Sequence, residues 1–378
     1  MPGRGEGRHP RAWIEGVACP LDEAIEAACD RLRNSRHPLF AGLGCDIEGV
    51  RTLVRLAKLA GGSIDHLSGT ATGIDLAVAR DAGMFLTTLG ETGARADTLL
   101  ILAPGASQEA RQSLKRLVET APMLAARHAP RNVIWVGQEP VPRTRSRRVK
   151  ITSVSLPPSR IAPILYALRA RLARRPVGAS PVSAPRLEAL VETLRRAKFG
   201  VAIWSSAALG PLAVETLAGL VRDLNEQTRF SGLPVATEDN AAGVAMAMTW
   251  LTGFPSNIGF LRGEAEHDPW RFDAARLARS GEADLALWIS AYRRRWPKWA
   301  SHVPVIALTT RSDGTEKPRA LVHIEVGTPG VDHDTIDLLP ETGSLAFRPA
   351  TTRNGMPSVA DVIRRIHARV ADKGRGIT

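Results

Sequence analysis

The sequence predicts an α/β protein made of two lobes, each built around a doubly wound parallel sheet. With 378 residues the chain is too long for one compact core, and its 44% apolar content suits a globular protein. Its two halves also repeat one order of elements: an apolar strand, a tight turn and an amphipathic helix, then later an Ala-Asp pair that leads into a second apolar run. Strands that alternate with helices in this way form parallel sheets covered by helices on both faces.

The elements of the first half follow from its apolar pattern. A strand is expected at 38–43, and the helix after it places its apolar side chains on one face between 47 and 57. The glycine pair at 61–62 ends this helix, because glycine readily adopts the left-handed conformation found just after helices. Further strands are expected at 98–102 and 132–136.

The second half repeats these elements. A strand is expected at 200–204 and a helix at 214–224, followed by strands at 283–289 and 303–308. The last fifty residues lose this rhythm until an amphipathic helix at 359–370, which is expected to close the fold.

These patterns suggest contiguous domain boundaries. The first lobe is assigned to residues 35–175 and the second to 186–325, with an N-terminal segment at 1–34 and a C-terminal segment at 326–378. The Pro/Ser/Ala-rich stretch 174–185 is expected to be the linker between the lobes.

The chain is strongly basic, with a net charge of +12 and a pI near 10.5. Such a balance favours an anionic partner. Aromatic residues make up only 5% of the chain and tyrosines number two, without the stacking pattern of RNA-binding strands. We therefore expect the arginines to lie on solvated helix faces and expect no nucleic-acid partner. A basic nucleic-acid-binding protein is the alternative from another functional class.

The sequence predicts a cytoplasmic protein that makes no membrane contact. Its longest uncharged run, 240–261, contains Pro255, Asn257 and several glycines, which is typical of a helix and a loop rather than a membrane span. The start, 1–10, is rich in Arg, His and Gly and has no apolar core of the kind a secretory signal needs.

The chain has three cysteines, Cys19, Cys29 and Cys45. An iron–sulfur cluster needs four thiolates at close spacing, and an odd number of cysteines argues against a disulfide framework. We expect three reduced, partly buried thiols and no cluster.

The segment Gly42-Leu43-Gly44 before a helix invites comparison with a dinucleotide-binding turn. That fingerprint needs a third glycine where Ile47 stands. The favoured interpretation is a tight strand-to-helix turn, whose amides would still point outward as a cradle for an anion.

No other motif nominates a catalytic or metal site. The chain has no Gly-x-Ser-x-Gly elbow, phosphate-binding Gly-x4-Gly-Lys loop or His-Glu-x2-His helix. His323 and His333 with the flanking Asp332 and Asp334 look like ligands, but their spacing is looser than in zinc enzymes. We expect them to be exposed loop residues.

Two segments carry a resemblance to a known family. The string TTLGETGARAD at 87–97 with the apolar run 98–102, and the ordered Asn-x2-Gly, Trp-x-Thr-Gly-Phe-Pro and Phe-x2-Gly motifs at 240–263, resemble the B subunit of formylmethanofuran dehydrogenase. The resemblance covers about residues 35–345. It implies the fold of the bis-pterin molybdenum/tungsten oxidoreductases without the N-terminal iron–sulfur domain, and in that family the lobes can be discontinuous in space.

The chain departs from this family where the redox centre would be. Ser68 and Gly69 stand at the place of the metal-binding cysteine, and Ala103 and Gly105 replace a Trp-Gly-x-Asn-Pro turn. The resemblance therefore implies a degenerate metal and pterin site with a structural Ser68, and no bound molybdopterin, tungsten or iron–sulfur cluster. Because serine ligates molybdenum in some relatives, a chain of an active tungsten or molybdenum formylmethanofuran dehydrogenase is the alternative.

A chain of this kind without its metal apparatus most resembles the B subunits of bacterial formyltransferase/hydrolase complexes. The resemblance implies a role in the tetrahydromethanopterin- and methanofuran-linked one-carbon metabolism of methylotrophs. It also implies an amidohydrolase-like A subunit, a C subunit and a formyltransferase D subunit as partners. This chain would then be a non-redox structural subunit without catalytic residues of its own.

A basic and aromatic segment, 292–299, is the candidate for carrier binding. In the family this position holds a loop that faces the cofactor. Arg293, Arg294, Arg295 and Lys298 could bind the glutamate chain of a methanofuran-type carrier through charge-assisted pairs. The other interpretation is a surface loop packed by its tryptophans.

Overall fold

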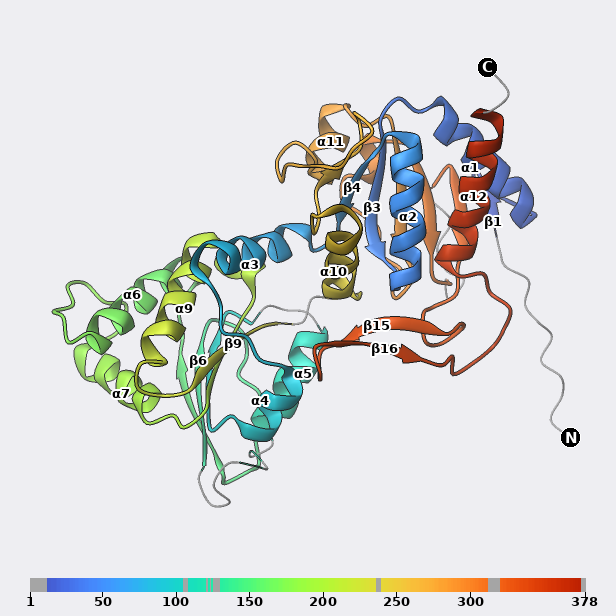
Figure 1. Ribbon diagram of the computed structural model, residues 1–378. Coiled ribbons are helices and arrows are strands. Elements are labelled where there is room, and N and C mark those ends of the chain that lie inside the picture. Colours follow the sequence, from blue (N-terminus) through green and yellow to red (C-terminus); the bar gives the residue numbers. More distant parts are fainter. Residues whose placement is uncertain are drawn as a thin grey trace, which may run out of the picture. The chain divides into compact units, whose positions relative to one another are not determined.

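The protein is a mixed α/β molecule with parallel sheets, as the sequence predicts (Figure 1). The computed structural model describes residues 12–104, 108–119, 122, 124, 130–235, 239–311 and 320–374. It divides into two compact units. Unit 1 comprises Met1–Gly69, Asp239–Leu338 and Leu345–Thr378, and unit 2 comprises Thr70–Glu238 and Leu339–Ser344.

Unit 1 is built on a nine-stranded sheet in the order β11-β10-β4-β3-β12-β13-β14-β1-β2. The five strands from β4 to β14 run parallel, whereas the pairs at the two edges are antiparallel. The central strands are apolar almost throughout because helices cover both faces. The strands are β1 (Ala12–Ile14), β2 (Val17–Cys19), β3 (Pro38–Gly44), β4 (Ser63–His66), β10 (Ile258–Gly259), β11 (Glu266–His267), β12 (Leu285–Ser290), β13 (Val305–Thr309) and β14 (Val322–Glu325).

One face of this sheet packs on four helices and the other on shorter elements. Helices α1 (Leu21–Asn34), α2 (Ile47–Ala60), α10 (Ala241–Thr252) and α12 (Val359–Gly374) cover the first face. The short α11 (Ala274–Ser280) and the 3₁₀ turn η2 (Ala300–His302) cover the second. Helix α2 begins at the N-cap Asp46 and ends at Gly61, whose positive φ confirms the predicted glycine stop.

A separate two-stranded sheet lies outside these layers. It is the hairpin of β15 (Thr335–Leu339) and β16 (Ser344–Arg348). Its strands belong to unit 1 apart from Leu339 and Ser344, and its turn belongs to unit 2.

Unit 2 has a five-stranded, wholly parallel sheet in the order β7-β6-β5-β8-β9. The strands are β5 (Thr98–Leu102), β6 (Arg131–Val136), β7 (Val149–Val154), β8 (Gly200–Trp204) and β9 (Phe230–Pro234). One face packs on α6 (Ile161–Leu172), α7 (Ala184–Arg195) and α9 (Pro211–Leu224), and the other on α4 (Leu89–Arg95) and α5 (Gln108–Glu119). The remaining helical elements are α3 (Gly69–Ala82), the 3₁₀ turn η1 (Pro158–Arg160) and α8 (Ser206–Leu209).

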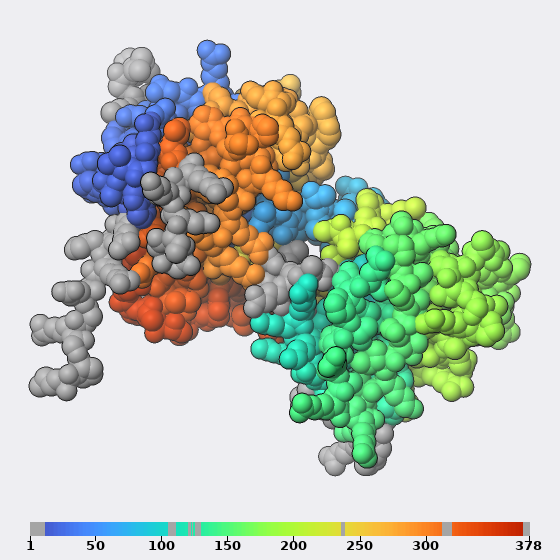
Figure 2. All heavy atoms as spheres, turned by 180° about the vertical axis from the view of Figure 1, so that it is seen from behind, coloured from blue at the N-terminus to red at the C-terminus, as the bar shows by residue number. Residues whose placement is uncertain are grey.

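The two units do not coincide with the ranges expected at 35–175 and 186–325, and they are discontinuous in sequence, as the resemblance allowed. Strand β3 pairs with β12 in unit 1, and β5 pairs with β8 in unit 2, so each sheet takes strands from both halves of the sequence. In the space-filling view, atoms from the blue and the orange-to-red ends of the colour bar accordingly share unit 1 (Figure 2). The stretch 174–185, expected to link the lobes, instead connects α6 to α7 within unit 2.

A fully buried arginine joins α4 and α5 to the sheet of unit 2. The Arg131 guanidinium donates to the backbone oxygens of Ala96 at 2.9 Å, Leu117 at 2.5 Å and Gly93 at 2.8 Å. The last backbone carbonyls of a helix have no hydrogen-bond partner within the helix. When they are buried, another group must donate to them. This arginine is therefore an exception to the expectation that arginines lie on solvated faces.

The structure bears out the interpretation of the long uncharged run as a helix and a loop, because α10 ends at Thr252 and Gly253 follows with positive φ. Among the described residues, no helix is both long and apolar enough to cross a membrane.

The sheet of unit 1 changes direction between β3 and β12. The chain runs from β3 to β4 on one side, and from β12 to β13 and β14 on the other. Gly42 sits at this contact with a φ of +86°, and a Cβ there would lie 2.5 Å from the backbone oxygen of Ile289. Only glycine allows the two strands to approach this closely.

We expect Gly42→Ala to lower the free energy of unfolding by at least about 2 kcal/mol, because alanine is strained at positive φ and its Cβ meets a strand carbonyl. Urea denaturation followed by tryptophan fluorescence measures this change. Gly73→Ala in α3 is the matched control, since a Cβ at Gly73 meets no atom within 4 Å. Equal effects of the two substitutions would contradict the close-approach argument.

Candidate functional site

The candidate site is the carboxyl edge of the unit 1 sheet, where β3 and β12 end side by side. Gly44 is the register partner of Ser290 at this edge. Open α/β sheets bind their ligands at the carboxyl ends of strands where the strand order reverses. The loops that follow β3 and β12 and the turn that precedes α10 meet here.

Side chains of β12 hold the backbone of the arginine turn. The Ser290 hydroxyl donates to the backbone oxygen of Arg293 and accepts from the amide of Arg295 at 3.3 Å. The Trp288 indole donates to the backbone oxygen of Arg295 at 2.9 Å. Because Ser290 and Trp288 are buried in the sheet, they fix the base from which the arginine side chains extend.

Arg293 and Arg295 share one buried carboxylate. Their Nε atoms lie 3.8 Å from Oδ1 and 3.4 Å from Oδ2 of Asp239, respectively. The Asp239 side chain is 3% exposed, whereas those of Arg293 and Arg295 are 35% and 32% exposed. Burial raises the pKa of Asp239 to about 6. The arginines thus neutralise a buried charge and keep part of their surface exposed.

Asp239 and Asn240 form a turn in the left-handed conformation, with φ values of 56° and 60°. Asx residues tolerate this region better than other side chains. The Asn240 amide nitrogen donates to the backbone oxygen of Cys45 at 3.1 Å, and its oxygen accepts from the amide of Leu338 at 3.2 Å. Asn240 therefore connects the end of β3 to the hairpin.

A second buried carboxylate lies on the hairpin. Asp337, on β15, is 4% exposed and accepts hydrogen bonds from the Tyr292 hydroxyl at 2.5 Å and the Thr335 hydroxyl at 3.0 Å. Its other oxygen pairs with Arg348 of β16. Burial and the Asp337 charge both raise the pKa of Tyr292, so this tyrosine stays protonated and donates.

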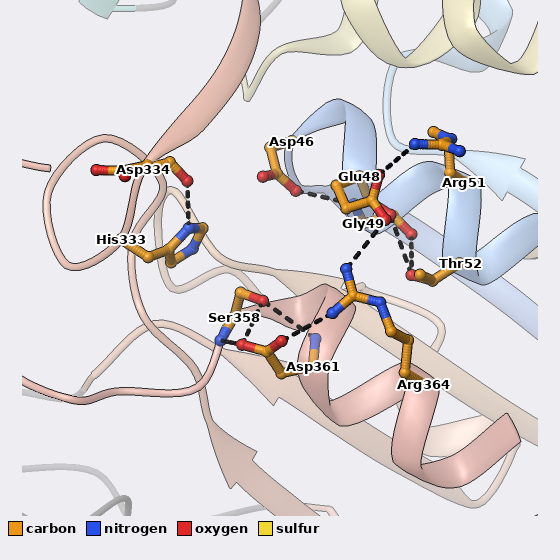
Figure 3. Close-up of polar contacts among 10 residues, drawn as sticks. All are labelled: Asp46, Glu48, Gly49, Arg51, Thr52, His333, Asp334, Ser358, Asp361 and Arg364. Atoms are coloured by element: carbon orange, nitrogen blue, oxygen red, sulfur yellow. Dashed lines mark hydrogen bonds and ion pairs between the residues drawn. The ribbon is translucent and has the colours of Figure 1, made fainter. Parts of the chain in front are cut away.

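A third carboxylate occupies the start of α2 (Figure 3). Asp46 Oδ1 accepts from the amide of Gly49 at 2.9 Å. Burial raises the pKa of Asp46, and the charge of nearby His333 acts in the opposite direction. Because a carboxylate of the chain already holds this helix terminus, the turn after β3 is not the open anion cradle that the sequence suggested.

An ion pair links the neighbouring helix α12 to α2. Arg364 pairs with Glu48 of α2 at 3.0 Å and with Asp361 of its own helix at 2.9 Å (Figure 3). The contact is half-exposed, so it contributes little stability beyond orienting the two helices.

The four residues expected to bind a carrier all follow β12, but they play different parts. Arg293 and Arg295 converge on Asp239. Burial lowers the pKa of His323, and the charge of Arg294 acts in the same direction. Lys298 is exposed.

The residues expected to form a degenerate metal and pterin site are not gathered in one unit. Ser68 and Gly69 belong to unit 1 and Ala103 to unit 2, while Gly105 lies outside the described residues. The Ser68 amide donates to Nδ1 of His66 at 2.8 Å, which explains the turn without a metal. Gly69 packs so closely on a buried Asp65 that a Cβ would lie 2.6 Å from its carboxylate oxygen.

Ser68 and Gly69 supply no thiolate for a metal ion. Within the described part of the chain, no group of three His, Cys, Asp or Glu side chains could hold a metal ion. Ser68 offers a hydroxyl where the resemblance requires a thiolate.

The cysteines behave as the sequence predicts. Cys19, Cys29 and Cys45 are free thiols, and the last two are buried. Burial raises the pKa of Cys29 to about 11 and that of Cys45 well above its ordinary value, so both stay protonated and inert.

The expectation that the histidines are exposed loop residues is wrong for His323. It lies on β14, is 2% exposed, stacks on Trp13 and shares a 2.8 Å hydrogen bond between its Nε2 and the Thr309 hydroxyl. His333 is half-buried in the loop before β15.

Sequence reasoning missed Asp239 and Asp337, the two carboxylates that organise the edge. The only local signal for Asp239 is the Asp-Asn pair before α10, and Asp337 alternates with apolar residues in a short strand. Neither pattern names a partner, because the partners come from distant segments.

No protein-family model matches the chain. The B subunit of the formyltransferase/hydrolase complex Fhc of Methylorubrum extorquens is 31% identical over 371 residues, which cover 96% of this chain and 99% of that protein. The B subunit of the tungsten-containing formylmethanofuran dehydrogenase 2 of Methanocaldococcus jannaschii is 22% identical over 324 residues, covering 81% of this chain and 74% of that protein.

A solved structure shows the same fold. The crystal structure of the formyltransferase/hydrolase complex FhcABCD from Methylorubrum extorquens, in complex with methylofuran, contains a chain that matches with a TM-score of 0.83 and 31% identity. The match covers 96% of this chain and 99% of that one.

The buried His323 makes stability depend on pH. Burial lowers its pKa from 6.5 to about 4, so the unfolded state binds more protons between these values. We expect this group to contribute about 3 kcal/mol of stability above pH 6.5, lost as the pH falls toward 4.

Urea unfolding measured across this pH range tests this expectation. In His323→Gln the free energy of unfolding should fall less steeply with decreasing pH, because the amide does not titrate. His302→Gln, at an exposed histidine, is the control. A His323→Gln profile parallel to that of the unmodified chain would show that His323 does not carry the dependence.

Proposed function

Because the chain belongs to the family of the B subunits of formyltransferase/hydrolase complexes, we propose that it serves as the B subunit of such a complex. The observation that carries the proposal is the match over nearly the whole length of both chains, in sequence and in fold. The resemblance expected from the motifs at 87–102 and 240–263 is thereby confirmed. The partners are the other subunits of the complex: an amidohydrolase-like A, a C and a formyltransferase D.

Within this assembly the chain acts as a non-redox structural subunit. Its fold derives from that of the bis-pterin oxidoreductases without an N-terminal iron–sulfur domain. Three features support this: Ser68 in place of a metal-binding cysteine, three scattered cysteines and an acidic cap on α2. The relation to a chain of a tungsten-containing dehydrogenase at 22% identity fits an origin from a redox ancestor.

We expect the tagged chain, isolated from its own cells, to co-purify with three other polypeptides and to contain tungsten, molybdenum and iron only at background level. Mass spectrometry of the isolated complex and elemental analysis measure both. Isolation of the chain alone would contradict its assignment to a complex. Tungsten or molybdenum equimolar with the chain would instead establish a redox subunit and overturn the non-redox role.

The arginine turn supplies a second part of the proposal, the binding of a carrier chain. The complex that contains the structural relative was solved with methylofuran, and the resemblance attributes a glutamate chain to carriers of this kind. Arg293 and Arg295 are about one-third exposed while paired with Asp239, and Lys298 is exposed nearby in sequence. Their outer faces offer charge-assisted hydrogen bonds to carboxylates.

Substituting only the two arginines would leave Asp239 as an unpaired buried charge and would destabilise the fold. The informative variant therefore combines Arg293→Gln and Arg295→Gln with Asp239→Asn. We expect it to bind methylofuran at least about tenfold more weakly, since each lost charged hydrogen bond contributes about 1.5 kcal/mol or more. Calorimetric titration of the isolated complex measures the affinity.

Two controls separate the local effect from overall charge. Asp239→Asn alone keeps both arginines, and Arg143→Gln with Arg145→Gln removes two exposed cations from unit 2. Unchanged affinity in the combined variant, or an equal loss in the unit 2 control, would rule out a carrier site at the arginine turn.

A further inference from the structure

The hairpin of β15 and β16 borders the point in unit 1 where an α/β sheet of this topology binds its ligand. It forms its own two-stranded sheet rather than extending the nine-stranded one. A two-stranded hairpin is at best marginally stable in water. Its position therefore depends on its contacts with the rest of the chain, which for β15 lie in unit 1 and for the turn include the Leu89 and Gly90 amides that donate to Pro340 and Glu341.

These contacts reach the ends of both strands that flank the switch point. On the β3 side, the amide of Leu338 donates to Asn240, and Asn240 donates to the backbone oxygen of Cys45. On the β12 side, the Tyr292 hydroxyl donates to Asp337. Strand β15 is thus hydrogen-bonded on either side of the switch point, through Asn240 and through Tyr292.

Arg293, Arg295, Arg348 and the start of α2 each hold a carboxylate of the chain itself. The first turn of α2 holds Asp46 and the arginine turn holds Asp239, as described above. Arg348 and the Tyr292 hydroxyl hold Asp337, which is 4% exposed. A phosphate entering this edge would meet three carboxylates of the chain, and only the outer faces of Arg293 and Arg295 would be left to it.

We propose that the β15–β16 hairpin is a built-in occupant of the switch-point crevice in unit 1. Asp337 takes the place of a ligand's acidic group, held by Tyr292 and Arg348. A nucleotide-type cofactor is thereby excluded from this edge. The proposal does not depend on the chain's role in a complex.

Amide hydrogen exchange of the full chain tests the proposal. We expect the amides of 335–338 and 345–348 to exchange at least about tenfold more slowly than unprotected amides, because a permanent occupant opens rarely. Guanosine diphosphate at saturating concentration serves as the probe for a nucleotide-type ligand. It should leave exchange at 42–46 and 290–295 unchanged.

Tyr292→Phe tests the contact that holds Asp337. Loss of one hydrogen bond should accelerate exchange in the hairpin roughly fivefold and leave β6 and α7 unaffected. Tyr166→Phe, at the chain's other tyrosine, is the matched control because Tyr166 is exposed on α6.

Two results would overturn the proposal. Hairpin amides exchanging at the unprotected rate would show a mobile lid, and slower exchange at 42–46 or 290–295 with guanosine diphosphate would show an open nucleotide site. Both readings come from the unmodified chain, so the test stands even if Tyr292→Phe fails to fold. Equal hairpin exchange in Tyr292→Phe and the control would likewise count against it.

Discussion

The parallel pairing of β3 with β12 is the constraint on which the rest of unit 1 depends. The two strands come from opposite ends of the sequence, and the whole of unit 2 except its short hairpin turn is inserted between them. Their close approach requires a residue without a side chain at Gly42. Because the strands are parallel and adjacent, the loops after them meet at one edge of the sheet. The same pairing thus creates the place where a site can form and selects the segments that supply it.

What this edge holds is a set of carboxylates that belong to the protein itself. An unpaired buried carboxylate is costly, so each one has a partner. An amide donates to Asp46, two guanidinium groups form ion pairs with Asp239, and a tyrosine and an arginine hold Asp337. The arginine turn therefore stabilises the fold as well as offering charge to a carrier. An edge filled in this way fits the non-redox structural role proposed for the chain.

Unit 2 follows the same physical logic with different residues. Its sheet also reverses direction, between β5 and β8, and there the indole of Trp204 and the hydroxyl of Ser206 donate to Asp75 of α3. Burial raises the pKa of Asp75, and these two donors oppose that shift. Arg131, at the opposite end of its strand, uses a guanidinium to satisfy helix carbonyls rather than a carboxylate. In both units, buried charged side chains thus link segments that are distant in sequence.

The sequence by itself determined the main apolar strands and amphipathic helices, because apolar periodicity is a local property. The strands expected at 98–102 and 200–204 and the glycine stop at 61–62 agree with the structure, and the motifs sufficed to identify the family. The arginine turn was also visible as a local run of charge. Tertiary structure alone decided which strands pair, and hence that both units are discontinuous. It also decided that Asp239 and Asp337 meet the turn after β12. Such contacts join residues far apart in the chain, and no local pattern encodes the partner of a buried charge.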